Sequence, residues 1–255
     1  MRHCYVLRVF TRGDSGGNPL GVVTDVTGLD GEKMQRIAFD LGFSETVFID
    51  WRTGGVPEAH IFTPTTELPF AGHPLVGAAW VLSVLGPGIT DSIRCQVAPV
   101  RFRVDGDAVW IAPPHDQPVR ASTEVLEGIQ PVDQVTVDMP LPYTVAQLET
   151  PGQVRSITGA PAEGAVYVWA WEEPGVSVKA RFFAGELGVV EDPATGSAAV
   201  ALAAALAHAG VDEGDIEIHQ GDEIDAPSSI LLRWSPGRVR VGGTVRRDEV
   251  RVLGT

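Results

Sequence analysis

Alternation of apolar and polar residues dominates the chain and predicts a protein built mostly from short strands. The apolar runs are short and are separated by Gly, Pro and Asp turns. Strands are predicted at residues 5–10, 21–23, 43–49, 60–62, 92–97, 100–104, 108–111, 135–137, 166–171, 177–183, 216–219, 230–234, 238–243 and 250–253.

A helical period of apolar residues occurs in only a few segments. Residues 29–41 predict an amphipathic helix, with Asp30 as N-cap and Gly42 as the stop. A short helix is also predicted at 123–127. Residues 74–85 and 197–209 have no charged face, and a helix that is apolar all round must be wrapped by other structure. The surrounding strands are the available wrapping.

The two apolar helices lie in matching sequence contexts. A shift of 124 positions aligns Glu67 with Glu191 and gives seven identities in twenty positions. An offset near half the chain length indicates two structural repeats, although shared Ala and Gly bias contributes to the match. We therefore predict an α+β fold of two pseudo-symmetric halves, each a curled mixed sheet around a central apolar helix. The predicted halves are residues 1–115, completed by the last C-terminal strand, and 116–255.

The composition of the chain argues against some classes of binding partner. The chain has 33 acidic and 19 basic residues, a formal charge of -14, so nucleic acid and anionic membranes are not expected to bind. Two cysteines without CxxC spacing indicate a reducing compartment. The apolar run at 198–207 is too short to span a bilayer, and the N-terminus does not resemble a signal peptide. A cytoplasmic protein is expected.

Glu45 is the first candidate for chemistry. Strand alternation places it on one face with Phe43, Val47 and Ile49. Desolvation on such a face raises the pKa of a carboxyl towards neutrality, which suits a group that takes up and releases protons. The alternative is a buried acid with a structural role.

Each apolar helix is preceded by a loop of small residues, E-L-P-F-A-G-H-P and E-D-P-A-T-G-S-A. The free N–H groups at two such helix starts, brought together by a two-fold relation, would bind a substrate carboxylate. Taken singly, these are also ordinary helix entries, His73 is also a satisfied core histidine, and Asp192 is also a turn residue. Metal-ligand, acyl-transfer and nucleotide motifs are absent from the sequence, so cofactor-free proton transfer is the chemistry that remains.

Four motifs together resemble the phenazine biosynthesis PhzF-like family, relatives of diaminopimelate epimerase. They are G-N-P-L-G-V-V at 17–23, F-S-E-T-V-F at 43–48, F-T-P-T-T-E-L-P-F-A-G-H-P-L-V-G at 62–77 and V-V-E-D-P-A-T-G-S-A-A at 189–199. The resemblance implies an active site between two epimerase-like halves. The two cysteines of the epimerase branch have no counterparts in these loops, so two-thiol racemisation is not expected.

The resemblance also implies the roles of individual residues. PhzF-like enzymes isomerise trans-2,3-dihydro-3-hydroxyanthranilate in phenazine-type, antibiotic-producing metabolism without a cofactor. By position, Glu45 is the proton shuttle, and His73 and Asp192 orient the substrate and assist proton movement. The remaining residues implied to bind substrate are Ser44, Gly72, Thr195, Gly196 and Ser197. A homodimer is expected from the resemblance alone.

The segment between Met139 and Val166 departs from the family pattern, because it is shorter than expected where a helix usually lies. This departure affects the expected identity of the substrate more than the expected mechanism. Two alternatives therefore stay open. One is an isomerase of another conjugated amino acid, and the other is a non-catalytic protein that binds small carboxylates.

Overall fold

The computed structural model of the chain describes residues 2–51, 55–85, 90–114, 116–185 and 189–253. It divides into two compact units. Unit 1 contains residues 1–14, 18–114 and 242–255, and unit 2 contains 15–17 and 115–241. The predicted boundary at residue 115 falls outside the described residues.

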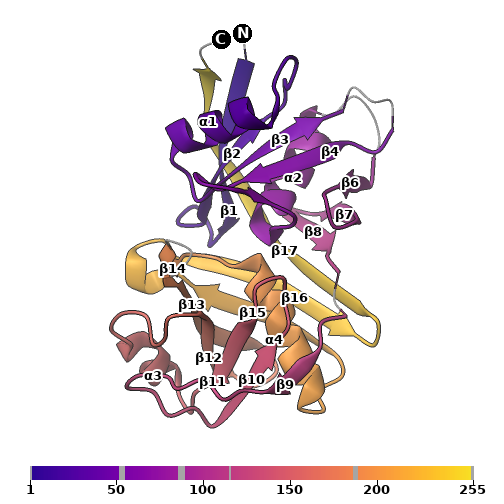
Figure 1. The fold of residues 1–255 in the computed structure, drawn as a ribbon. Coiled ribbons are helices and arrows are strands. Elements are labelled where there is room, and N and C mark those ends of the chain that lie inside the picture. The colour runs from indigo at the N-terminus through magenta and orange to yellow at the C-terminus, as the bar shows by residue number, and fades with distance from the viewer. Residues whose placement is uncertain (1, 52–54, 86–89, 115, 186–188, 254–255) are drawn as a thin grey trace. The chain divides into compact units, whose positions relative to one another are not determined.

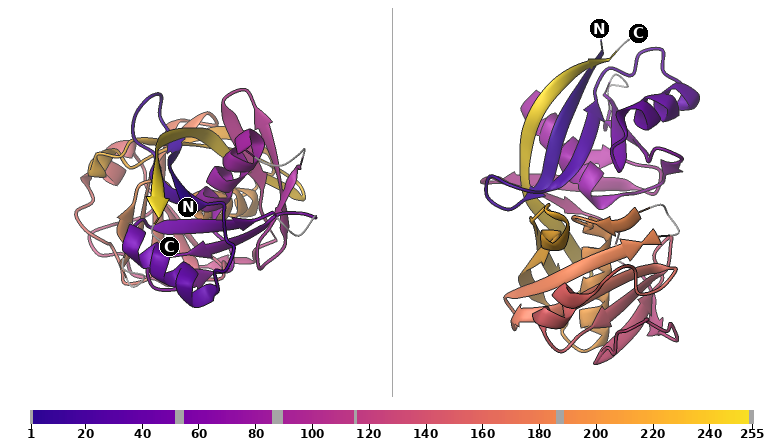
Figure 2. Two further views of the ribbon diagram at one scale, coloured as in Figure 1. Left: turned by 90° about the horizontal axis from the view of Figure 1, so that it is seen from above. Right: turned by 90° about the vertical axis from the view of Figure 1, so that its left-hand side faces the viewer.

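Unit 1 is a mixed sheet with two helices (Figure 1). Its elements are β1 Arg2–Thr11, β2 Asn18–Val23, α1 Gly31–Leu41, β3 Glu45–Asp50, β4 Glu58–Phe62, β5 Glu67–Leu68, α2 Gly72–Leu85, β6 Ser92–Arg94, β7 Pro99–Asp105 and β8 Ala108–Ala112. Most of β17, Arg238–Leu253, also belongs to this unit and pairs antiparallel with β1, so that Arg2 lies opposite Leu253. The start of β1 and the end of β17 therefore lie side by side (Figure 2).

Unit 2 is a second mixed sheet (Figure 1). Its elements are β9 Val119–Ala121, β10 Asp133–Val137, β11 Tyr143–Gln147, α3 Pro151–Ser156, β12 Ala165–Glu173, β13 Ser177–Ala184, β14 Val189–Asp192, α4 Gly196–His208, β15 Gly214–Gln220, the 3₁₀ turn η2 Asp222–Ile224, β16 Ser228–Ser235 and the start of β17.

The two units repeat one connection pattern. In unit 1, β1–β2 is antiparallel, β2–β3 parallel across α1, β3–β4 and β4–β5 antiparallel, and β4–β6 parallel across α2. In unit 2, β10–β11 is antiparallel, β11–β12 parallel across α3, β12–β13 and β13–β14 antiparallel, and β13–β15 parallel across α4. The predicted α+β fold with two pseudo-symmetric halves is confirmed.

The apolar helix α2 is the core of unit 1. It packs against β1, β2, β3, β7 and β8, and most of its residues from Gly72 to Leu82 are buried. Gly77 allows this close packing, because a Cβ at this position would come 2.3 Å from Leu20 Cδ2 on β2. The wrapping of this helix by strands, predicted from its lack of a charged face, is confirmed.

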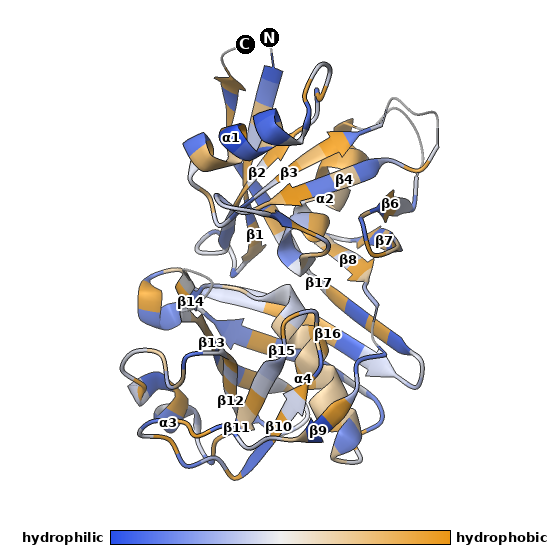
Figure 3. Cartoon of the chain, in the orientation of Figure 1, coloured by the Kyte–Doolittle hydropathy of each residue, from blue (hydrophilic) through white to orange (hydrophobic). Residues whose placement is uncertain are grey.

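The helix α4 has the equivalent place in unit 2, where it contacts β9, β10, β11 and β16. Figure 3 shows the contrast with α1, which carries hydrophilic residues, whereas α4 is pale to orange along most of its length. Helix α1 has a solvent face, and its Asp30 N-cap accepts a hydrogen bond from the Lys33 N–H. Gly42 ends α1 in the left-handed conformation, so both predicted caps are confirmed.

Several local predictions were wrong. Residues 123–127 form no helix, and residues 238–243 and 250–253 belong to one continuous strand, β17. Sequence patterns missed α3 and the short strands β5, β9, β11 and β14. Among the described residues, no helix is long and apolar enough to cross a membrane.

Candidate active site

Glu45 begins β3, where the strand meets the buried core of unit 1. It lies opposite Leu20 in the parallel β2–β3 ladder, and Val47 and Ile49 on its face are fully buried. Phe43 was wrongly placed on this face. It precedes the strand, and a Cβ added at Gly21 would lie 3.1 Å from the Phe43 ring and 3.3 Å from Thr46 Oγ1, so the ring lies on the face of Thr46, opposite to that of Glu45. Strict alternation holds only from the residue at which the ladder begins.

The environment of Glu45 favours the protonated carboxyl. Its side chain is 18% exposed, and burial, which disfavours the charged carboxylate, raises the pKa of Glu45 to about 7. The predicted shift of this pKa towards neutrality is confirmed. A carboxyl with a pKa near 7 is present in both protonation states at neutral pH, as a group that both takes and returns protons requires.

His73 is the partner of Glu45. It is the second residue of α2, directly after Gly72, and it is 4% exposed. Its Nε2 lies 3.5 Å from Glu45 Oε2. Among the described residues, none donates a hydrogen bond to that buried oxygen. Strand β3 and helix α2 thus bring together two predicted site residues that are distant in sequence.

Asn18, which had no predicted role, connects this pair to Ser44. It is fully buried, its Nδ2 lies 3.4 Å from His73 Nδ1, and its Oδ1 accepts from Ser44 Oγ at 3.3 Å. The motif G-N-P-L-G contains Asn18 and was the available signal. A polar residue at the first position of a buried strand needs hydrogen-bond partners from elsewhere in the fold.

In unit 2, the loop before α4 is held by its own side chains. Thr195 is the N-cap of α4, but its hydroxyl makes no capping hydrogen bond. It donates instead to Asp192 Oδ2 at 2.5 Å. Gln220 Nε2 donates to the Asp192 carbonyl and to Thr195 Oγ1, at 2.7 and 3.0 Å. The cap side chain therefore leaves the first amides of α4, at Gly196 and Ser197, available to other acceptors.

Ser197 is the second residue of α4, and its hydroxyl lies 3.0 Å from the hydroxyl of Tyr143 on β11. The Tyr143 ring packs against Phe182, with the ring centroids 5.1 Å apart. The hydrogen bond with Tyr143, a residue of β11, therefore orients the Ser197 hydroxyl. Sequence reasoning missed Tyr143 because β11 was not predicted, and it missed Gln220 because a residue at a strand end carries no periodic signal.

Glu67 and Glu191, which the 124-position shift aligns, both contact side chains of neighbouring strands. Glu67 contacts His60 on β4 at 3.1 Å, and Glu191 binds Arg181 on β13 through both carboxylate oxygens. The Arg181–Glu191 pair lies directly before Asp192, the last residue of β14.

The structure thus gathers the eight predicted site residues into two groups, one in each unit. Unit 1 holds Ser44, Glu45, Gly72 and His73, and unit 2 holds Asp192, Thr195, Gly196 and Ser197.

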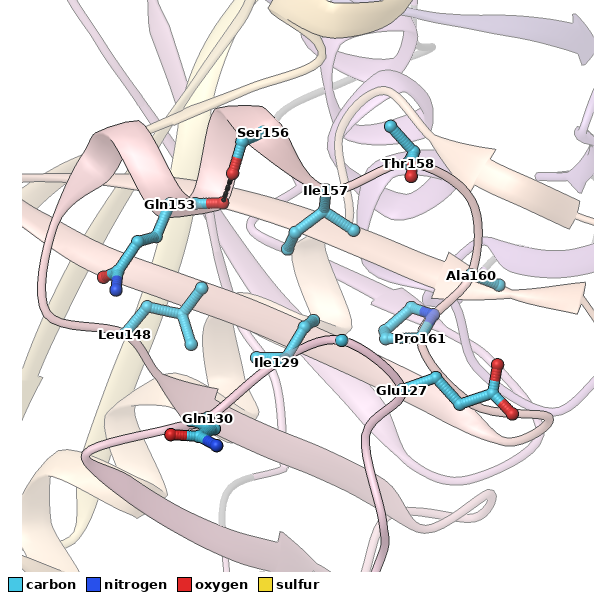
Figure 4. A pocket seen from close by; sticks show the side chains of 11 residues that line it. Glu127, Ile129, Gln130, Leu148, Gln153, Ser156, Ile157, Thr158, Ala160 and Pro161 are labelled. Carbon is cyan, nitrogen blue, oxygen red and sulfur yellow. Dashed lines mark hydrogen bonds between the residues drawn. The ribbon is translucent and has the colours of Figure 1, made fainter.

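Two cavities lie away from these groups. One, of about 380 Å³, lies beside α3 in unit 2, with Leu148, Ile157 and Pro161 among its lining residues (Figure 4). The other, of about 320 Å³, lies beside the start of α1 in unit 1. Neither contains a predicted site residue. The described part of the chain contains no group of three or more His, Cys, Asp or Glu side chains suited to hold a metal ion.

The fold places the chain among α+β proteins with two pseudo-symmetric halves. A solved structure of a putative phenazine biosynthesis PhzC/PhzF protein from Clostridium difficile matches it over 100% of both chains, with a TM-score of 0.82 at 19% sequence identity. The model of the phenazine biosynthesis-like (PhzC-PhzF) family matches residues 7–109 and 140–255. The chain belongs to this family.

Two curated relatives indicate the reaction class. An uncharacterized isomerase from Pasteurella multocida is 32% identical over 94% of this chain and 90% of its own length. The trans-2,3-dihydro-3-hydroxyanthranilate isomerase of Pseudomonas chlororaphis is 31% identical over 91% of this chain and 90% of its own length. The chain is an isomerase of the phenazine biosynthesis-like family.

Proposed function

We propose that the protein moves a proton between two carbons of a small unsaturated amino acid without a cofactor, and that trans-2,3-dihydro-3-hydroxyanthranilate is the leading candidate substrate. The observation that carries the reaction type is the buried Glu45 carboxyl, with a pKa of about 7 and His73 Nε2 at 3.5 Å. The relative from Pseudomonas chlororaphis supports the substrate.

The proposed step balances within the substrate and Glu45. The ionised carboxylate takes a proton from one substrate carbon, and the electron pair of that C–H bond enters the conjugated system as a double bond shifts. The same carboxyl then returns the proton to another carbon on the same face. A single group with a pKa near the working pH serves both half-steps.

The second part of the proposal concerns the substrate carboxylate. Amide groups at the start of a helix favour an anion, and the side chain of Thr195 is engaged by Asp192 rather than by those amides. We propose that Gly196 and Ser197 bind this carboxylate. Ser44, Gly72 and Thr195 are further proposed substrate-binding residues, and we propose that His73 and Asp192 orient polar groups of the substrate.

The decisive experiment compares Glu45→Gln with the wild type in deuterated buffer. We expect the variant to fold and to lose exchange of the substrate's carbon-bound proton, measured by proton NMR. Glu58→Gln is a matched control, because Glu58 lies on the neighbouring strand β4 and its side chain is 41% exposed. Retained exchange in Glu45→Gln would remove Glu45 from the mechanism.

The short segment between β11 and β12 gives a reason to test other substrates. Helix α3 there has only 6 residues, whereas its counterpart α1 in unit 1 has 11. Turnover should therefore be compared between dihydro-hydroxyanthranilate and other conjugated amino acids. Saturable binding without turnover of any of them, unchanged in Glu45→Gln, would indicate a carboxylate-binding protein instead.

A further inference from the structure

Asn18 contacts both Ser44 and His73, but the proposed reaction gives it no role. It is the first residue of β2, and its side chain reaches both Ser44, before β3, and His73, at the start of α2. It is 0% exposed. A buried amide is costly unless its hydrogen bonds are made, so the partners of its two ends define what it does.

We propose that Asn18 is a positioning residue that holds His73 in the tautomer with its proton on Nε2. The amide nitrogen of Asn18 can only donate, so the His73 Nδ1 that lies 3.4 Å away must accept. A neutral imidazole with an accepting Nδ1 carries its proton on the other nitrogen. That nitrogen is the one that lies 3.5 Å from Glu45 Oε2.

Ser44 sets the direction of the amide. Its hydroxyl donates to Asn18 Oδ1 at 3.3 Å, which turns the Nδ2 end of the amide towards His73. If the Asn18 amide were reversed, its Oδ1 would face His73 Nδ1, and that ring nitrogen would have to carry the proton. The hydrogen-bond network is therefore what determines the tautomer. Ser44 therefore orients the Asn18 amide, and Asn18 in turn fixes the tautomer of the His73 ring that faces Glu45.

The catalytic meaning of this arrangement rests on the proposed function. An Nε2–H group directed at Glu45 stabilises the carboxylate that takes the proton. Because Nε2 already carries a proton, the neutral ring cannot accept the one that Glu45 collects, so Glu45 retains it for return to the substrate. The 3.5 Å separation is longer than a good hydrogen bond, and such contacts commonly shorten when substrate binds.

The first test needs no variant and no substrate. Long-range proton–nitrogen NMR of protein labelled with ¹⁵N-histidine reports the tautomer of each of the six histidines. The His73 signals are assigned from their loss in His73→Gln. We expect the pattern of a neutral ring protonated on Nε2. A ring protonated on Nδ1 in the wild type would overturn the proposal.

The second test uses Asn18→Asp, which keeps the size of the side chain but replaces the donor by an acceptor. We expect the His73 signals to change to a ring protonated on Nδ1, either alone or together with Nε2. The signals of His60, whose Nδ1 contacts Glu67, serve as the internal control. An unchanged His73 pattern in folded Asn18→Asp would contradict the proposal.

Measurements of turnover separate the claim about the His73 tautomer from the claim that Asn18 contributes to catalysis. In Asn18→Asp we expect kcat to fall about tenfold to a hundredfold, with KM changed less than about threefold, because the ring is mis-protonated while the substrate-binding groups remain. An unchanged kcat with an altered tautomer would remove the catalytic role of Asn18. No turnover by the wild type, with Nε2 protonated, would refute the proposed function and leave the tautomer assignment intact.

Discussion

Arg181 binds both carboxylate oxygens of Glu191, with Nε and Nη2 at 2.8 and 2.7 Å. Both side chains are almost fully buried, 6% and 7% exposed. The remaining nitrogen, Nη1, donates to the carbonyls of Val154 and Ile157 at the end of α3. One guanidinium therefore ties the short helix α3 to β14, the strand that leads to Asp192.

Loss of one partner of this pair is predicted to destabilise unit 2 strongly. Glu191→Gln or Arg181→Met leaves a buried charge or buried carbonyls without partners, and we expect the free energy of unfolding to fall by about 3 to 5 kcal/mol. Urea denaturation of the two single variants and the double variant measures this. Asp215→Asn is the control, because Asp215 and its partner Arg233 are 63% and 46% exposed and the pair should contribute less than about 1 kcal/mol. Fully additive losses in the double variant would show that the pair does not act as a unit.

Tyr143→Phe is predicted to weaken substrate binding more than turnover. The variant removes the hydroxyl that lies 3.0 Å from Ser197 Oγ and keeps the ring that packs on Phe182. Loss of one hydrogen bond to a binding residue should raise KM about threefold to tenfold and leave kcat nearly unchanged. Steady-state kinetics checks this. A fall in kcat at unchanged KM would assign Tyr143 to the chemical step instead.

Gly77→Ala is predicted to disturb the packing of α2 on β2. A Cβ at Gly77 would lie 2.3 Å from Leu20 Cδ2, so Leu20 must move within a closed core, at a cost of about 1 to 3 kcal/mol. Gly31→Ala, at the start of α1, is the matched control, because no atom lies within 4 Å of the added carbon. Thermal unfolding of both variants measures the difference, and equal Tm values would show that the core accommodates the methyl group.

The sequence predicts those parts of the fold that depend on local patterns. The caps of α1, the strand at Glu45 and the two apolar helices follow from residue types at short spacing. Helix α3 also had a local signal, the capping box formed by Thr150 and Gln153, which was overlooked. Strand β11 was missed because its buried residues form a continuous run, Thr144 to Ala146, and therefore show no alternation.

The site is predicted only in part, for a related reason. Glu45 is conspicuous because its own strand is apolar. Asn18 and Tyr143 acquire their roles from partners 55 and 54 residues away, His73 and Ser197. No local pattern specifies such pairings, because they are set by the register of neighbouring strands and by where each central helix begins.

The raised pKa of Glu45 predicts a stability that depends on pH. The pKa is about 7 in the folded protein against 4.5 for an ordinary glutamate, because burial disfavours the carboxylate. Between these values the folded state binds more protons than the unfolded chain, so stability falls as the pH rises from about 4.5 through 7. The full loss is about 3 kcal/mol. The side chain of residue 45 in Glu45→Gln is neutral at every pH, so the variant does not show this loss of stability. We therefore expect the variant to match the wild type near pH 4.5 and to become more stable above pH 7, as measured by urea denaturation across this range. A constant difference between Glu45→Gln and the wild type would mean that Glu45 titrates as an ordinary carboxyl.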